Sequence, residues 1–365
     1  MPLAKPKISV LIADDSALMR REIKNILESD PDISVVGAAR DGREAVEMTK
    51  QLEPDVVALD INMPGMDGLT ALQLIMMESP RPVVMVSSLT QEGALTTYEA
   101  LELGATDFVG KPGGTISLDI ARVAQEMIMK IKGAALARTN RIRLRRTQQV
   151  KKTTRERAAV AARPKTSASV KARDKIVVIG QSTGGPNTIF DIIPLLPEDL
   201  GPPVIIVQHM PSGFTPSFAA RLDSNCAFPF KEAARGDLIE PGKGYLAPGD
   251  VHLSLVARSK TLGGCMARLT EHPKDARYYP SVDVTMDSAL AHYGANTIGV
   301  LLTGMGDDGA DAMVHIRQAG GRTIAESEET AVVFGMPAEA IRRGGAEFVL
   351  PSYKIAEKII ELVRS

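Results

Sequence analysis

The chain alternates short apolar runs with segments of helical periodicity, and it does so in two blocks. In the first block the strand-like runs are ISVLIA, ISVVGA, DVVALD, PVVMVSS and TDFVG. Between them, segments such as residues 16–29 and 68–78 carry apolar residues three or four positions apart. Uninterrupted apolar runs are typical of parallel strands that helices cover on both faces. The pattern therefore predicts an α/β fold built on a doubly wound parallel sheet.

The second block begins at Lys175 and repeats this alternation. KIVVIG, PVIIVQH and NTIGVLLTG are expected to be buried parallel strands. Residues 186–196, 216–224 and 282–293 are expected to be helices, as is the segment that follows LLTGMG. Residues 228–270 have a shorter period and many Gly and Pro residues, which predicts a small β element there. The second block is thus a second α/β domain.

A basic stretch separates the two blocks. Residues 138–173 contain many Arg, Lys, Ala, Ser and Thr residues, and Glu156 is the only acidic residue among them. We expect a solvated linker that is helical at its start. The alternative, a docking segment for an acidic partner or nucleic acid, has weak support because no aromatic residues are interleaved. The expected organisation is a first domain at 7–132, a linker at 133–174 and a second domain at 175–365.

Length and composition agree with an intracellular protein of two domains. The chain has 365 residues, 44% of them hydrophobic, and a net charge of −1, which gives no general attraction to nucleic acid. Its two cysteines, Cys226 and Cys265, are too few for a disulfide framework and fit a reducing compartment. No signal peptide or membrane-length apolar run is visible. We expect a cytoplasmic monomer that does not insert into membranes.

Polar residues follow the strands of the first domain. Asp14 and Asp15 come after the first strand, Asp60 ends the third, Ser87 ends the fourth, and Lys111 follows the fifth. In an open parallel sheet, functional groups gather where the carboxyl ends of the strands meet. Three carboxylates there would repel one another without a cation, and oxygen ligands suit Mg²⁺. Such a pocket is suited to phosphoryl transfer to an aspartate.

Taken singly, an aspartate such as Asp15 is more often a helix cap than a metal ligand. The full set, however, lies within ADD, LDINMPGMDG, MVSS and GATDFVGKP, and with these motifs the first domain resembles a response-regulator receiver domain with a flavodoxin-like sheet. The resemblance implies that Asp60 is the phosphoacceptor and that Ser87 and Lys111 contact the phosphoryl group. It further implies that Asp14, Asp15, Asp60 and the backbone carbonyl of Asn62 bind Mg²⁺, and that Phe108 is the aromatic switch residue.

The second domain opens with the stretch GQSTGG. It has no lysine for a phosphate-binding Walker loop, and Gln181–Ser182 interrupts a dinucleotide fingerprint. It does match G-x-S-x-G between a strand and a helix, which would present Ser182 as a nucleophile. An inert serine in a glycine-rich turn is the alternative. A serine nucleophile also needs a base.

His209 is the best candidate for that base. It directly follows the strand PVIIVQ, which places it on the same sheet edge as Ser182, one crossover away. We expect the other four histidines to be packing, loop or surface residues: His252, His272, His292 and His315. An orienting carboxylate should lie on the same edge. Asp307, Asp308 and Asp311 in LTGMGDDGAD are candidates, although any of them could cap the next helix.

The motifs GQSTGGP, VQHMP, LTGMGDDG, YLAPGD and VVFGMP together resemble the catalytic domain of the chemotaxis protein-glutamate methylesterase (CheB) family. The resemblance implies Ser182 as nucleophile, His209 as base and Asp308 as orienting residue. It also implies that the backbone amides of Thr183 and Met305 form the oxyanion hole. Tyr278–Tyr279 stand where the family commonly has His-Arg. Because of this departure from the family pattern, we assign these two tyrosines no role.

With a receiver domain in front, the family resemblance implies phosphorylation-activated hydrolysis of γ-glutamyl methyl esters on chemoreceptors, with release of methanol. Deamidation of receptor glutamines is a further implied activity of this carboxylic ester hydrolase. A chemotaxis histidine kinase would be the phosphodonor, and no cofactor is expected in the esterase site. The alternative is a response regulator whose second domain is a non-catalytic binding or nucleic-acid output module.

Overall fold

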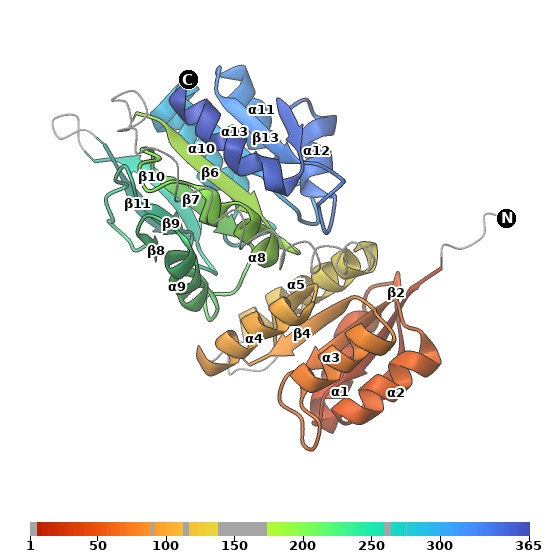
Figure 1. Ribbon diagram of the computed structural model, residues 1–365. Helices are drawn as coiled ribbons and strands as arrows, with labels where there is room; N and C mark the ends of the chain where they lie inside the picture. The colour runs from red at the N-terminus through yellow and green to blue at the C-terminus, as the bar shows by residue number, and fades with distance from the viewer. Residues whose placement is uncertain (1–5, 89–90, 112–116, 138–173, 259–263, 275) are drawn as a thin grey trace. The chain divides into compact units, whose positions relative to one another are not determined.

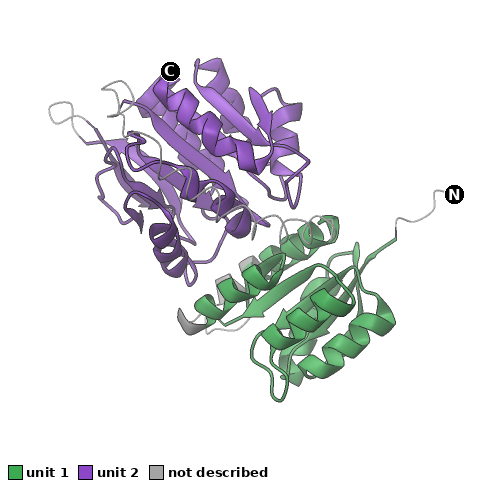
Figure 2. Cartoon of the chain, viewed as in Figure 1, with its two compact units in different colours: residues 1–148 green, residues 149–365 purple. Residues whose placement is uncertain are grey.

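The computed structural model describes residues 6–88, 91–111, 117–137, 174–258, 264–274 and 276–365 (Figure 1). The chain divides into two compact units, residues 1–148 and 149–365 (Figure 2). The basic stretch 138–173, which we expect to be a linker, lies outside the described residues. None of the described helices has the length and apolarity that a membrane span requires.

Unit 1 is a five-stranded parallel sheet in the order β2-β1-β3-β4-β5, which confirms the flavodoxin-like expectation. Helices α1 and α5 pack together on one face of this sheet, and α2, α3 and α4 pack in a row on the other. The elements are β1 (Ile8–Ala13), α1 (Ala17–Glu28), β2 (Ile33–Ala39), α2 (Gly42–Leu52), β3 (Val56–Asp60), α3 (Gly68–Glu78), β4 (Val83–Ser87), α4 (Gln91–Leu103), β5 (Asp107–Gly110) and α5 (Ser117–Leu136).

The direction of winding in unit 1 reverses between strands β1 and β3. The chain passes from β1 outward to β2 on one side, and from β3 outward to β4 and β5 on the other. Helices therefore diverge from the gap between β1 and β3, which leaves the carboxyl ends of these two strands uncovered. Fully buried valines and isoleucines such as Val10, Ile12 and Val84 hold the sheet to its helices.

Unit 2 contains a seven-stranded parallel sheet in the order β14-β13-β12-β6-β7-β9-β8, which confirms the second α/β expectation. Helix α11 contacts both α10 and α12, and helix α13 contacts the 3₁₀ turns η1 and η2. The elements are β6 (Ile176–Gln181), α8 (Gly185–Thr188), η1 (Ile189–Asp191), η2 (Ile193–Leu195), β7 (Val204–Gln208), α9 (Thr215–Asn225), β8 (Phe230–Glu232), β9 (Gly244–Leu246), β10 (His252–Ala257), β11 (Cys265–Thr270), α10 (Val282–Tyr293), η3 (Gly294–Asn296), β12 (Thr297–Leu301), α11 (Ala310–Gln318), β13 (Arg322–Glu326), α12 (Met336–Arg342), β14 (Phe348–Leu350) and α13 (Ser352–Arg364).

The helix expected over residues 186–196 is wrong as a single element. The structure has the four-residue α8 followed by two 3₁₀ turns, η1 and η2. Pro194 disfavours a regular helix through the second half of this segment, because proline lacks a backbone N–H and its ring clashes with the preceding turn of a helix. Residues 228–270 do form the expected β element. They add β8 and β9 to one edge of the sheet and form the separate antiparallel pair β10–β11.

Unit 2 also reverses its winding at one place, the gap between β6 and β12. The chain passes from β6 to β7 on one side and from β12 to β13 on the other. The residues that follow β6, β7 and β12 therefore meet at one edge of the sheet. These are the segments that carry Ser182, His209 and Asp308.

Two candidate functional sites

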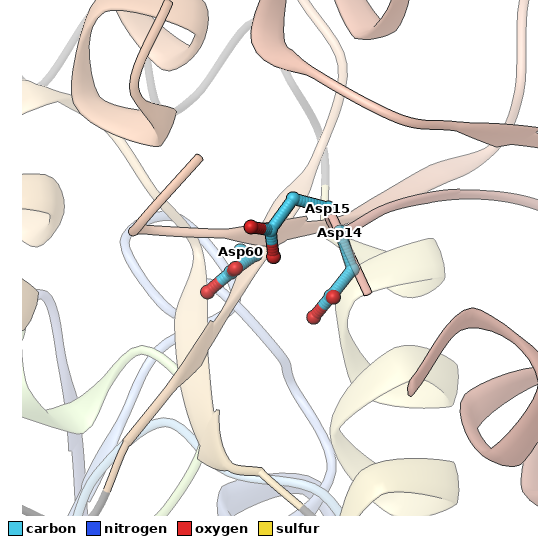
Figure 3. Close-up of side chains that lie close together, drawn as sticks. All are labelled: Asp14, Asp15 and Asp60. Carbon is cyan, nitrogen blue, oxygen red and sulfur yellow. The ribbon is translucent and has the colours of Figure 1, made fainter. Parts of the chain in front are cut away.

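Three carboxylates converge at the end of the gap between β1 and β3. Asp14 and Asp15 follow β1, Asp60 is the last residue of β3, and one oxygen of each lies within 4.8 Å of the others. Figure 3 shows these side chains close together. Asp14 and Asp60 are buried, whereas Asp15 is exposed. Asp15 does not cap α1, because Ser16 is the capping residue and its side chain accepts a hydrogen bond from the Met19 N–H.

Lys111 balances this negative charge. Its Nζ lies 2.9 Å from Asp14 Oδ2 and 2.8 Å from Asp60 Oδ2. Burial raises the pKa of Asp60, and Lys111 opposes that rise. Burial also acts to lower the pKa of Lys111, but its hydrogen bonds to Asp60 and Asp14 outweigh burial and the net shift is upward. The ammonium group therefore stays charged, as contact with an anion requires.

The donor set fits Mg²⁺. Carboxylate oxygens are the ligands that this cation prefers, and Asp14, Asp15 and Asp60 supply them from one small region. A divalent cation among them would offset the repulsion between the carboxylates and oppose the upward shift of the Asp60 pKa. Asn62, exposed and two residues after Asp60, donates its N–H to Asp60 Oδ1 at 3.3 Å.

Ser87 and Phe108 lie on the neighbouring strands of the same sheet. Ser87 ends β4, is buried, and its Oγ donates to the carbonyl of Gly93 at 3.3 Å. The backbone N–H of Lys111 donates to the Ser87 carbonyl at 2.8 Å, which links the ends of β4 and β5. Phe108 is fully buried in β5, with its ring edge-on to Tyr98 at 6.2 Å between centroids.

Ser182 follows β6 at the switch point of unit 2. It is buried, and its backbone N–H donates to the Thr303 carbonyl at 3.0 Å, which ties it to the segment after β12. Gly184 has φ +79°, in the left-handed region that favours glycine, and a Cβ at this position would lie 2.5 Å from Val332 Cβ. The tight turn that presents Ser182 therefore requires glycine here.

His209 follows β7 and lies beside this turn. Its backbone N–H donates to the Gln181 carbonyl at 3.2 Å. The buried side chain of Gln208 donates to the carbonyls of both Ser182 and His209, at 3.1 and 3.2 Å. Gln208 thus joins the two turns that carry the nucleophile and the base, a role that the sequence did not reveal. Its position directly before His209, at the end of the predicted strand, was the only indication of this role in the sequence.

The imidazole of His209 contacts Asp308. His209 Nε2 lies 2.7 Å from Asp308 Oδ2. His209 Nδ1 and Ser182 Oγ make no hydrogen bond within the described part of the chain. Because Nε2 contacts the carboxylate, Nδ1 is the nitrogen that a proton exchange with Ser182 would have to use. In the Ser-His-Asp template the two nitrogens have the opposite assignments.

Asp308 is held by the N-terminus of α10. It accepts hydrogen bonds from the Val282 N–H at 2.6 Å, the Asp283 N–H at 3.1 Å and Ser281 Oγ at 2.8 Å. Burial acts to raise the pKa of Asp308, but the hydrogen bond and charge of His209 together with these amides lower it. The carboxylate therefore stays ionised although it is buried.

The two other candidate aspartates are paired elsewhere. Asp307 and Asp311 both form ion pairs with Arg343, each at 2.6 Å. None of the three aspartates caps α11, whose N-cap is Gly309. Thus only Asp308 of this group meets His209, and the capping alternative does not hold for α11.

Thr183 and Met305 border the same site. Thr183 follows the serine, and Met305 lies in the turn after β12, beside Gly304. Neither backbone N–H donates a hydrogen bond to any residue that the structure describes. Two such amides at one sheet edge are suited to stabilising a negatively charged oxygen.

Three further residues around the triad candidates were missed from the sequence: Tyr278, Ser281 and Asp283. His252 is a buried packing residue, as expected. The Tyr278 ring stacks on His209, and the His252 Nδ1 accepts the Ser281 N–H at 3.2 Å. Ser281 directly before a helical pattern is a recognisable N-cap signal. The other contacts arise from loop packing and leave no local pattern.

Comparison with known proteins identifies the family of each unit. Residues 177–359 match the family model described as CheB methylesterase, and residues 10–121 match that of the response regulator receiver domain. A protein-glutamate methylesterase/protein-glutamine glutaminase of Caldanaerobacter subterraneus subsp. tengcongensis is 52% identical over 98% of this chain and 97% of its own length. A similarly named relative, numbered 2, from Carboxydothermus hydrogenoformans is 53% identical over 98% of this chain and 99% of its own length.

Among solved structures, the Thermotoga maritima CheB methylesterase catalytic domain is 49% identical and covers 52% of this chain and 98% of its own, with a TM-score of 0.50. The relatives match both units, and the sheet-edge serine and histidine lie within the matched region. The chain therefore belongs to the CheB methylesterase family and is a hydrolase that joins a response-regulator receiver domain to a methylesterase domain.

Proposed function

We propose that this protein hydrolyses γ-glutamyl methyl esters of chemoreceptors, with Ser182 as nucleophile, His209 as base and Asp308 as orienting residue. The 2.7 Å contact between His209 Nε2 and Asp308 Oδ2, at the sheet edge that also carries Ser182, is the observation that carries the proposal. Membership of a methylesterase family supports the substrate class. Deamidation of receptor glutamines follows the same chemistry, because an amide and an ester give the same acyl-enzyme.

In the first half of the reaction, Ser182 Oγ attacks the ester carbonyl while its proton passes to His209 Nδ1. The C–O bond to methanol breaks as the imidazolium returns the proton to the leaving oxygen. Asp308 accepts the Nε2–H of the imidazolium throughout and keeps the ring in one orientation. In the second half, water attacks the acyl-enzyme, and the same histidine takes and returns the proton.

The backbone amides of Thr183 and Met305 are the proposed oxyanion donors. Both are free of other acceptors among the described residues, so they meet the developing charge without breaking an existing hydrogen bond. Loss of one such donor typically lowers kcat by about 10²–10³.

We further propose that phosphorylation of Asp60 by a chemotaxis histidine kinase raises the esterase activity. Mg²⁺ held by Asp14, Asp15, Asp60 and the Asn62 carbonyl would neutralise charge on the phosphoryl oxygens. Lys111, which already contacts Asp60, would bind one of these oxygens, and Ser87 would donate its hydroxyl to another. Phe108 would report the change through its packing in β5. Adding charge at one site in this way is a known means of biasing a two-state element.

The test is methanol release from methylated receptor membranes. Ser182→Ala should abolish release, and Asp308→Asn should lower kcat by about 10⁴, because the imidazole loses its orienting charge. Asp307→Asn is the matched control, since it makes the same change at the neighbouring residue, which pairs with Arg343 instead. Release by Ser182→Ala at the wild-type rate, or equal losses for the two asparagine variants, would contradict the proposal.

A further inference from the structure

The loop before α10 places a tyrosine flat on the candidate base. The rings of Tyr278 and His209 have centroids 4.3 Å apart and planes within 4° of parallel. Tyr278 is 9% exposed, so its ring is part of the packed interior of unit 2. Aromatic pairs at this separation are attractive beyond the area that they bury. The stack covers one face of the imidazole.

The other end of the same side chain meets the turn after β12. A Cβ on Gly306 would lie 2.2 Å from the Tyr278 hydroxyl and 3.2 Å from its Cζ. Gly306 has φ +92°, which also favours glycine. This glycine directly follows Met305, the proposed oxyanion donor. One side chain therefore contacts both the base and the turn that carries the oxyanion amide.

The loop that carries Tyr278 is itself held in place. Tyr279 stacks on the buried His252 ring at 4.4 Å and donates its hydroxyl proton to the Pro273 carbonyl at 3.1 Å. His252 in turn accepts the Ser281 N–H, and Ser281 donates to Asp308. The tyrosine thus belongs to the same rigid group of residues that holds the carboxylate.

These contacts restrain His209 in two independent directions. The hydrogen bond from Nε2 to Asp308 acts in the plane of the ring, and it leaves the ring free to tilt about the Nε2–Oδ2 line. The stack with Tyr278 acts perpendicular to the plane and opposes that tilt. The free Nδ1 is the atom whose direction depends on the tilt, because it lies on the side of the ring away from Asp308.

The stack also suits the charge that develops during the reaction. When His209 accepts a proton it becomes a cation, and a cation within about 6 Å of the face of a tyrosine ring is attracted to it. Burial raises the pKa of Tyr278, and although Arg277 opposes this, the net shift is upward. The ring is therefore a neutral phenol at the pH at which the base works.

We propose that Tyr278 is a positioning residue of the esterase site, which holds the His209 imidazole in the plane from which Nδ1 reaches Ser182 and fixes that plane relative to the Met305–Gly306 turn. The inference rests on the proposed function. It assigns a role to a tyrosine for which the sequence alone gave none. Any flat aromatic ring should fill this role, whereas an aliphatic side chain of similar size should not.

The experiment compares Tyr278→Phe, Tyr278→His and Tyr278→Leu in the full chain by steady-state methanol release. The Phe and His variants should keep kcat within about twofold of wild type. The Leu variant should lower kcat about tenfold, equivalent to about 1.4 kcal/mol of transition-state stabilisation, with KM within twofold. Labelling of Ser182 by a fluorophosphonate should slow in the Leu variant by the same factor, because it also needs the base. Tyr353→Leu, at an exposed tyrosine of the same unit, is the control and should match wild type.

Thermal unfolding of each variant is measured alongside, and Tyr278→Met replaces the Leu variant if that protein is unfolded at the assay temperature. Wild-type kcat and labelling rate in the aliphatic variant would overturn the inference, and so would an equal loss in the Phe variant. A change in KM alone would also overturn it, since it would indicate substrate contact instead. Failure of the proposed function is distinguishable, because wild type itself would then release no methanol.

Discussion

At the scale of single residues, Asp283 is a second carboxyl group beside the esterase site. It lies in the first turn of α10, and its Oδ1 accepts the backbone N–H of Ala312 at 2.9 Å. Burial raises its pKa to about 7, and the nearby charge of Asp308 adds to the rise. Below about pH 7, Asp308 is ionised while Asp283 holds a proton, so the pair then carries one negative charge.

This pair predicts a particular dependence of stability on pH. The folded state binds a proton at Asp283 that the unfolded state releases above about pH 4, so the free energy of unfolding should fall as pH rises from about 4 to 7 and level off above. Asp283→Asn, which mimics the neutral acid, should match wild type near pH 4. At pH 8 the free energy of unfolding of this variant should exceed that of wild type by about 2 kcal/mol. This difference is smaller than the full pKa shift would give, because the carboxyl keeps some contact with solvent.

Urea unfolding at a series of pH values measures the difference. Asp250→Asn in the same unit is a suitable control, because Asp250 is exposed and accepts the backbone N–H of Ser212 at the surface. Parallel curves for wild type and Asp283→Asn between pH 4 and 8 would show that Asp283 is ionised in the folded protein.

At the scale of elements, the N-terminus of α10 serves the site directly. Its first backbone N–H groups, which no helical carbonyl accepts, donate to Asp308, and the positive end of the helix dipole favours the carboxylate. Ser281 has two functions here. Its Oγ accepts the Val284 N–H at 3.3 Å as a helix cap and donates to Asp308 Oδ1 at 2.8 Å.

Ser281→Ala should therefore affect both stability and activity. We expect a loss of about 1 kcal/mol in the free energy of unfolding, the usual cost of a lost N-cap. We also expect kcat to fall by about tenfold, since a hydrogen bond to a charged group is worth about 1.5–3 kcal/mol and part of it orients Asp308. Ser281→Thr should restore both.

Ser288→Ala is the matched control for this change. It removes a hydroxyl from the same helix that bonds the Leu255 N–H and the Thr285 carbonyl, and it does not contact Asp308. Its unfolding free energy should drop while its kcat stays unchanged. Wild-type kcat in Ser281→Ala, at whatever stability, would mean that the cap does not orient the carboxylate.

At the scale of the whole molecule, both units place their polar groups at the same kind of sheet edge. Unit 1 places its carboxylates at the switch point between β1 and β3, and unit 2 places its serine and histidine beside the switch point between β6 and β12. The proposed regulation requires that the first site controls the second. Under this proposal the two chemistries are also separate, because the metal would act at the receiver site and the serine chemistry would take place in unit 2.

That separation predicts how the full chain responds to a small-molecule phosphodonor. With Mg²⁺, wild type should release methanol about tenfold faster, equivalent to about 1.4 kcal/mol in the equilibrium between less and more active states. Asp60→Asn should keep the basal rate and lose the stimulation. Chelation of Mg²⁺ should have the same effect on wild type.

Asp67→Asn controls for a change of charge close to the site. Asp67 caps α3 through a 2.7 Å hydrogen bond from the Thr70 N–H and is exposed. This variant should be stimulated like wild type. Stimulation of Asp60→Asn to the wild-type level would exclude Asp60 as the regulatory phosphoacceptor.

The sequence by itself determined the architecture of both units and the position of most polar groups along the strands. Continuous apolar runs that alternate with helical segments are typical of a parallel sheet with helices on both faces, and the residues after its strands then lie at one edge. This is why Asp14, Asp60, Ser182 and His209 were placed from the sequence. Motif resemblance then selected Asp308.

Only the tertiary structure decided what those groups contact. Residue spacing left Asp307, Asp308 and Asp311 equivalent, and the structure separates them because the turn after β12 directs one toward α10 and the others toward Arg343. The stack of Tyr278 on His209 and the bridge of Gln208 likewise join segments far apart in the chain. Such contacts depend on where loops pass in three dimensions, and periodicity carries no record of that.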